Sequence, residues 1–190
     1  MHRALTDFVL ELVQNAVDAG AGRVWVSIRE GAEAFSAAVR DDGPGMTRAE
    51  RARAEDPFRS GGRKHPGRRV GLGLPLLRQT VEMTDGRWRL RTAPGRGTRV
   101  AFAFDLRHPD TPPVGDVASL LLSVLAMAGG RQVRILRMRN GRGYRIDGPA
   151  LAGAAGGLDT AGGLALARMF VEAKEEALAE SGRKRGHDHG

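Results

Sequence analysis

The chain has 190 residues, of which 41% are hydrophobic, so it is long enough and apolar enough to fold around a core. It contains no cysteine, which excludes disulfide bonds, thiol catalysis and cysteine-ligated metals. The formal net charge is +8, and no segment has the roughly 18 consecutive apolar residues of a membrane span or the pattern of a signal peptide. We therefore expect a basic, cytoplasmic protein.

The first part of the chain is predicted to fold as a mixed unit of helices and strands. Apolar residues recur every three or four positions in the expected helices and at alternate positions in the expected strands. Thr47 followed by Glu50 is the capping-box pattern that starts a short helix. Residues 56–69 are basic and rich in glycine, and we expect a mobile loop there. The predicted elements are a helix at 6–20, strands at 24–28 and 35–40, helices at 47–54 and 75–84, and strands at 87–92 and 99–106.

A linker that contains prolines then leads to a smaller region. Asn140-Gly141 is a strong hairpin signal between two short strands, and an apolar helix precedes them. No structure is assigned to the segment at 151–163, which is rich in glycine and alanine. The predicted organisation is a domain at 1–107, a linker at 108–114, a small αββα region at 115–180 with helices at 116–128 and 164–180, and a disordered tail at 181–190.

Three polar residues share one side of the first predicted helix. Glu11, Asn15 and Asp18 follow one another at i, i+4 and i+7, away from the apolar side of that helix. A carboxamide oxygen can ligate Mg²⁺, and a carboxylate one turn earlier can orient a water molecule or a hydroxyl. The same pattern also suits the solvated face of an amphipathic helix, so these residues alone leave both interpretations open.

Further motifs lie where predicted elements begin or end. A carboxylate at Asp41 can accept a hydrogen bond from an exocyclic amine, and Gly45 lets the backbone approach a flat base. The glycines at 71 and 73 precede a helix, where free backbone N–H groups can meet phosphate. Thr98 follows the tight turn at 94–97. Each of these motifs, taken alone, is equally an ordinary turn.

The order and spacing of all the motifs resemble the GHKL superfamily, which comprises gyrase, the heat-shock chaperone ATPases, sensor histidine kinases and mismatch-repair ATPases. The resemblance covers about residues 5–105. The segment ELVQNAVDAGA looks most like the mismatch-repair branch, whereas PFRSG followed by GLGLPLL looks more like the kinase branch. This family implies an α+β fold, a two-layer α/β sandwich of the Bergerat type, with ATP held between the helices and a mobile lid. The segments that carry the resemblance are ELVQNAVDAGAG, DDGPGM, PFRSG, VGLGLPLL and GRGTRVAFAF.

The resemblance implies ATP and Mg²⁺ as cofactors and assigns roles to matching positions. Glu11 is the expected general base and Asn15 the expected Mg²⁺ ligand, while Asp18 supports the site near the nucleotide. Arg69 stands where the kinase branch often has another glycine. The remaining expected nucleotide-binding residues are Asp41, Gly43 and Gly45 at the adenine, Gly71, Leu72, Gly73 and Leu74 at the lid hinge and phosphates, Thr98 on the adenine side, and a cation among Arg63, Lys64, Arg68 and Arg69 in the lid.

Three functions are compatible with this resemblance. The first is a stand-alone regulatory or kinase-like module that acts on a partner protein or within a homodimer. The sequence has no helix pair with a phospho-accepting histidine, which argues against autophosphorylation and permits phosphorylation in trans. The second is a slow ATPase in which Glu11 activates water. The third is a non-enzymatic module whose basic surface contacts nucleic acid or an acidic protein, above all through the arginine-rich hairpin at 131–145. The enrichment in arginine is, however, also typical of proteins encoded by a high-GC genome.

Overall fold

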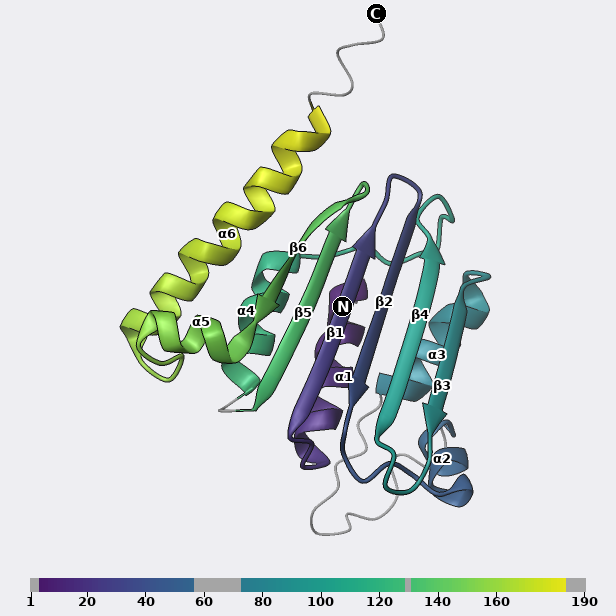
Figure 1. Ribbon diagram of the computed structural model, residues 1–190. Helices are drawn as coiled ribbons and strands as arrows, with labels where there is room; N and C mark the ends of the chain where they lie inside the picture. Colours follow the sequence, from purple (N-terminus) through teal and green to yellow (C-terminus); the bar gives the residue numbers. More distant parts are fainter. Residues whose placement is uncertain (1–3, 57–72, 129–130, 184–190) are drawn as a thin grey trace, which may run out of the picture.

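Six strands form one mixed sheet in the order β3-β4-β2-β1-β5-β6 (Figure 1). The structure, a computed structural model, describes residues 4–56, 73–128 and 131–183. β1 and β5 run parallel, and the other neighbouring pairs run antiparallel. The αββα region therefore contributes its hairpin to the same sheet as the N-terminal part. The strands are β1 (Arg23–Glu30), β2 (Ala34–Asp41), β3 (Arg87–Thr92), β4 (Thr98–Asp105), β5 (Gln132–Arg139) and β6 (Arg142–Asp147).

The helices α1, α3 and α4 lie on one face of this sheet, behind it in Figure 1. The opposite face of β4, β2 and β1 is not covered by a helix of the described residues. None of the described helices is both long and apolar enough to cross a membrane. The helices are α1 (Leu5–Asp18), α2 (Arg48–Ala54), α3 (Gly73–Met83), α4 (Val117–Ala128), α5 (Gly148–Ala155) and α6 (Ala161–Arg183).

The core lies between the sheet and the helices, as the periodicity of the sequence predicted. The predicted apolar side of the first helix is buried in α1, and alternate side chains of β4 are buried against it. Phe102 of β4 is at the centre, and its ring lies 6.3 Å from those of Phe8 and Phe35 and 5.7 Å from that of Phe104. Burying such aromatic side chains is a major source of the free energy of folding.

The capping box predicted at Thr47 is confirmed. The backbone N–H of Glu50 donates to Thr47 Oγ1 at 3.2 Å, and the Thr47 N–H donates to Glu50 Oε2 at 2.9 Å. These two bonds satisfy N–H groups that the first turn of α2 leaves without helical partners. Gly73, rather than Pro75, begins α3, while Pro75 falls inside its first turn.

Three segments differ from the expectation or extend it. The helix α5 forms where no structure was assigned, because Asp147 Oδ1 accepts a hydrogen bond from the Ala150 N–H at 3.2 Å and a proline occupies its first turn. The predicted linker is fastened to α1, since the carbonyl oxygen of Pro113 accepts from the Leu5 N–H at 2.9 Å. The helix α6 continues to Arg183, past its predicted end. The rest of the predicted tail and nearly all of the predicted lid lie outside the described residues.

A buried ion cluster joins α6 to the sheet. Arg137 of β5 is only 1% exposed, and its Nη2 donates to Glu30 Oε2 at 2.5 Å. Its Nε donates to Glu175 Oε1 of α6 at 3.1 Å, and the same oxygen accepts from the Tyr144 hydroxyl at 2.6 Å. Burial opposes the guanidinium charge, but hydrogen bonds to Glu175 and Glu30 outweigh it and raise the pKa of Arg137. Arg137 is buried because positions 133, 135 and 137 of β5 face the helices.

Candidate functional site

A buried carboxylate lies at the end of β2. Asp41 is 8% exposed, and its Oδ1 accepts hydrogen bonds from the N–H of Gly43 at 2.8 Å and of Thr98 at 3.2 Å. No other described residue donates to this carboxylate, so Oδ2 is left without a protein donor among them. Burial raises the pKa of Asp41, the two backbone N–H donors lower it, and the charge of Asp42 raises it, for a net increase. The site therefore holds an acceptor in a fixed orientation with one oxygen available.

Two glycines allow the turns around Asp41 to touch. Gly97 has φ +69°, and a Cβ at this position would collide with the carbonyl of Asp41. Gly45 has φ +67°, and a Cβ there would collide with the carbonyl of Ala93. Because both positions combine positive φ with a backbone neighbour, side chains are excluded from them. The turn at 41–45 and the turn at 93–98 thus form one close-packed unit.

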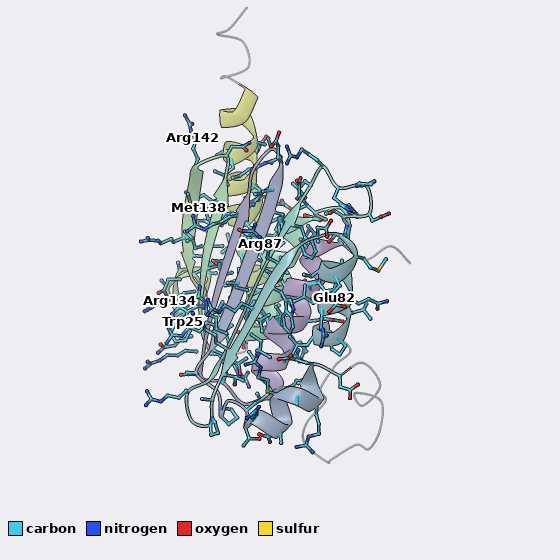
Figure 2. All side chains as sticks on the ribbon, turned by 90° about the vertical axis from the view of Figure 1, so that its right-hand side faces the viewer. Trp25, Glu82, Arg87, Arg134, Met138 and Arg142 are labelled. Carbon is cyan, nitrogen blue, oxygen red and sulfur yellow. The ribbon has the colours of Figure 1, made fainter. Side chains whose placement is uncertain are left out.

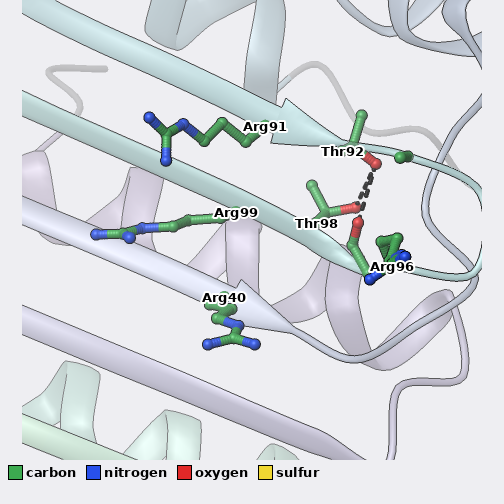
Figure 3. Close-up of a pocket in the computed structure, with 8 residues that line it drawn as sticks. Arg40, Arg91, Thr92, Arg96, Thr98 and Arg99 are labelled. Atoms are coloured by element: carbon green, nitrogen blue, oxygen red, sulfur yellow. Dashed lines mark hydrogen bonds between the residues drawn. The ribbon is translucent and has the colours of Figure 1, made fainter.

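Thr98 and Thr92, of which the sequence predicted only the first as a site residue, link these turns (Figure 3). Thr92 Oγ1 accepts from the Met46 N–H at 2.9 Å, donates to the Gly97 carbonyl at 3.1 Å, and lies 3.2 Å from Thr98 Oγ1. The two threonines are directly opposite in the β3–β4 register, so pairing the two predicted strands would have revealed them. The role of Thr98 beside an adenine stays a prediction, and Thr92 is the residue that contacts it.

We expect Thr92→Val to destabilise the protein by about 1–3 kcal/mol, because the Met46 N–H loses its acceptor while the side-chain shape is kept. Chemical denaturation followed by circular dichroism measures the change. Thr111→Val is the matched control, since its hydroxyl donates to the Asp105 carbonyl at 2.8 Å in an exposed position. An equal loss in both variants would contradict the structural role of Thr92.

Asp42, the neighbour of the buried carboxylate, fastens the end of β2 to the turn that follows α1. Its Oδ1 accepts from the N–H of Gly22 at 2.9 Å and of Arg23 at 2.8 Å. A Cβ on Gly43 would lie 3.8 Å from that of Ala19, so the turn at 41–45 rests against the C-terminal end of α1. The sequence showed two adjacent aspartates but did not indicate that one would be buried at the candidate site while the other accepts hydrogen bonds from the turn after α1.

The other end of the predicted site lies at the middle of α1. A Cβ on Gly73 would collide with the carboxylate of Glu11, so the first turn of α3 lies directly against α1 there. Glu11 Oε2 is buried at this contact. Asn15 is one turn further on, partly exposed, and no described residue hydrogen-bonds its carboxamide. The structure thus brings Glu11 and Gly73 together and places Asn15 beside them along α1.

Of the remaining predicted site residues, some lie away from Asp41 and Glu11, and others are outside the residues that the structure describes. Asp18 is exposed, and its Oδ1 accepts from Gln14 Nε2 at 2.7 Å. The side chain of Leu74 is 5% exposed and belongs to the hydrophobic core. Gly71, Leu72 and the four lid cations lie outside the described residues. Their predicted roles stay predictions.

Residues 2–108, more than half of the chain, match the family model of histidine kinase-, DNA gyrase B- and HSP90-like ATPases. A curated relative, the sensor histidine kinase AruS of Pseudomonas aeruginosa, is 30% identical over 174 residues, which cover 80% of this chain and 17% of that protein. The non-motile and phage-resistance protein of Caulobacter vibrioides is 30% identical over 117 residues, which cover 57% of this chain and 14% of that one. The chain thus spans less than a fifth of the length of either relative.

Among solved structures, the N-terminal domain of a DNA repair protein superposes with a TM-score of 0.50 at 15% identity, covering 85% of this chain and 58% of that one. At this identity the likeness concerns the fold alone. It agrees with the two-layer α/β sandwich that the sequence predicted, which the mixed sheet and its helices confirm. With the family match over residues 2–108, the chain belongs to the GHKL superfamily of histidine kinase-, DNA gyrase B- and HSP90-like ATPases.

Proposed function

We propose that the chain binds ATP with Mg²⁺ between α1, the turn at 41–45 and the start of α3, and acts as a nucleotide-dependent regulatory or kinase-like module on a partner protein. The observation that carries this proposal is the buried Asp41, whose Oδ1 is held by two backbone N–H groups while Oδ2 has no donor among the described residues. An exocyclic amino group, such as that of adenine, supplies the missing donor.

The length of α1 supports the same ligand. The turn that carries Asp41 rests against Ala19, and Glu11 meets the first turn of α3 eight residues earlier. At 1.5 Å per helical residue, these two ends are about 12 Å apart along the helix axis. A nucleotide extended along α1 would place its base at Asp41 and its phosphates at the N-terminus of α3, where backbone N–H groups favour anions.

Magnesium fits the residues at the phosphate end. Mg²⁺ prefers oxygen ligands and is usually bound by one or two protein groups together with substrate phosphates and water. Within 4–56, 73–128 and 131–183, no three acidic or histidine side chains cluster as a ready-made metal cage. The carboxamide of Asn15 would therefore hold the ion together with the phosphates, and the bound ion would neutralise phosphate charge.

A slow ATPase is the second candidate, and Glu11 favours it. Its Oε2 is buried where the start of α3 meets α1, next to the place proposed for the terminal phosphate. A carboxylate there can orient a water molecule for hydrolysis or a partner's hydroxyl for transfer. Similarity to sensor histidine kinases supports transfer to a partner, and a homodimer is one form that this partner can take. A cytoplasmic location also stays a prediction.

Isothermal titration calorimetry with ATP, in the presence of Mg²⁺ and then of a chelator, tests the binding. Heat of binding that weakens on chelation supports the proposal, and no heat in either condition overturns it. If ATP binds but γ-labelled phosphate is neither released nor transferred to a co-purified protein, the non-enzymatic alternative replaces both enzymatic ones.

Glu11→Gln is expected to keep ATP binding and to lower phosphate release or transfer by about a hundredfold or more, because the amide cannot accept the proton. Release of γ-labelled phosphate measures the effect, and calorimetry checks that the nucleotide still binds. Glu82→Gln, an exposed glutamate of α3, is the matched control and is expected to retain the parent rate. Unchanged turnover in Glu11→Gln would remove Glu11 from the catalytic role.

A further inference from the structure

The face of the sheet opposite α1 carries a row of arginines that the proposed nucleotide site does not use. Figure 3 shows Arg91, Arg99 and Arg40 side by side on three neighbouring strands. Figure 2 shows Trp25 and Arg134 on the side of the sheet away from Glu82 of α3. The strand register places one residue of every strand in a single line, which we call the arginine row: Arg91 of β3, Arg99 of β4, Arg40 of β2, Trp25 of β1, Arg134 of β5 and Asp147 of β6.

The charge of this row is largely uncompensated. Arg91, Arg99 and Arg40 are exposed, and none of them forms an ion pair with another described residue. Neighbouring strands are about 4.8 Å apart, and like charges directly opposite one another destabilise a sheet. Arg134 alone in the row has an acidic partner, Asp147 Oδ2 at 3.2 Å. A bound polyanion would relieve this repulsion.

Trp25 lies in the middle of the row with one arginine already over its ring. The Arg40 guanidinium carbon is 5.0 Å from the indole centroid, within the range of a cation–π contact. Two residues further along the same three strands, β1, β2 and β4 carry small side chains next to the row: Ser27, Ala38 and Ala101. Trp25, Ser27 and Ala38 line a depression on this face. These small side chains leave room beside Trp25 for a planar group that stacks against the indole ring.

We propose that this open sheet face binds single-stranded nucleic acid, with phosphates along the arginine row and a base stacked on Trp25. Single-strand sites combine a basic track with exposed aromatic rings in this way. An acidic protein would match the arginines but would make no use of the indole. A duplex keeps its bases stacked inside and offers Trp25 no free base face. Two arginines of the predicted hairpin site are engaged within the fold, since Arg137 is buried and Arg139 pairs with Glu30 at 3.3 Å, whereas Arg134 of the hairpin belongs to the arginine row.

The test is fluorescence anisotropy of a labelled thymidine oligonucleotide, carried out on the full chain at low salt without ATP. The double variant Arg91→Gln/Arg99→Gln removes two charges from the row. Arg78→Gln/Arg168→Gln removes two exposed charges from α3 and α6 and is the matched control. We expect the row variant to bind at least about tenfold more weakly and its salt slope to fall by about 1.4, while the control changes by less than about twofold.

Trp25 provides a second readout. In a Trp88→Phe background, Trp25 is the remaining tryptophan of the chain, and the oligonucleotide is expected to quench its fluorescence. Trp25→Phe should keep most of the affinity and Trp25→Ala should lose about tenfold, because stacking needs a ring rather than an indole nitrogen. Circular dichroism verifies that each variant is folded.

Four outcomes would overturn the proposal. They are no binding at low salt, equal losses in the row variant and its control, tighter binding of a duplex than of the single strand, and displacement of the oligonucleotide by polyglutamate at a lower concentration than by unlabelled oligonucleotide. The last outcome would identify an acidic protein as the partner. Because the test contains no ATP, its result is independent of the proposed nucleotide site.

Discussion

Asp41→Asn is expected to weaken ATP binding by about a hundredfold or more while the fold is retained. The asparagine carbonyl can still accept from the N–H groups of Gly43 and Thr98, so the two turns stay connected. Its NH₂ group, however, takes the place of Oδ2 and meets the adenine amino group donor to donor. Calorimetry with ATP and Mg²⁺ measures the loss.

Replacing the adenine base of the ligand distinguishes recognition of adenine by Asp41 from a general disruption of the nucleotide site. Inosine triphosphate has a 6-oxo acceptor where ATP has an amino donor, so it is expected to bind Asp41→Asn better than ATP does and the parent protein worse. Asp110→Asn, at an exposed position, serves as the control and should bind ATP like the parent. If Asp41→Asn binds ATP with the parent affinity, Asp41 does not read the base.

The same substitution should not destabilise the protein at neutral pH. Burial raises the pKa of Asp41, so the folded state binds this proton more tightly than the unfolded state does. The free energy of unfolding therefore falls as the pH rises from the ordinary aspartate range through the raised pKa. Asparagine lacks this cost, and the variant should be at least as stable as the parent at pH 7, with a difference that shrinks as the pH is lowered. Urea denaturation at several pH values measures it.

Arg137→Ala is expected to destabilise the protein by about 3–5 kcal/mol, because it leaves two partly buried carboxylates without their shared cation. Glu30 and Glu175 are each 16% exposed and both contact the guanidinium. Urea or guanidinium denaturation measures the loss. The comparison is Arg134→Ala, whose exposed pair with Asp147 should be worth no more than about 1 kcal/mol.

A double-mutant cycle makes the assignment specific. If the charge pair carries the effect, Glu175→Gln should reduce the cost of Arg137→Ala, since one carboxylate then no longer needs a cation. Equal costs for Arg137→Ala and Arg134→Ala would mean that the cluster relaxes on mutation and does not hold α6 to the sheet.

Local sequence patterns predicted the elements well because the forces that set them are local. The apolar periodicity of α1, the alternation in β4 and the cap at Thr47 all depend on residues a few positions apart. The Asn140-Gly141 turn was predicted for the same reason, and both residues do have positive φ. The order of motifs in the first half then identified the family and its fold.

What the sequence did not reveal depends on contacts between distant segments. The parallel pairing of β5 with β1 joins residues more than a hundred positions apart, and no local signal encodes it. The burial of Arg137 follows from that pairing, since its partners come from β1 and α6. Likewise, Arg40, Arg91 and Arg99 are scattered in the sequence, and only the strand register aligns them.

Because β5 pairs with β1, the sheet extends beyond the last residue of the family match. The match ends at residue 108, yet β1 bonds to β5 along its whole length and α1 packs against α4. A fragment cut at that boundary would expose a full-length edge strand and an apolar helix surface, which together promote aggregation. The part of this chain that matches the family model is therefore one piece of a larger sheet, and we expect its solubility to depend on residues outside that match.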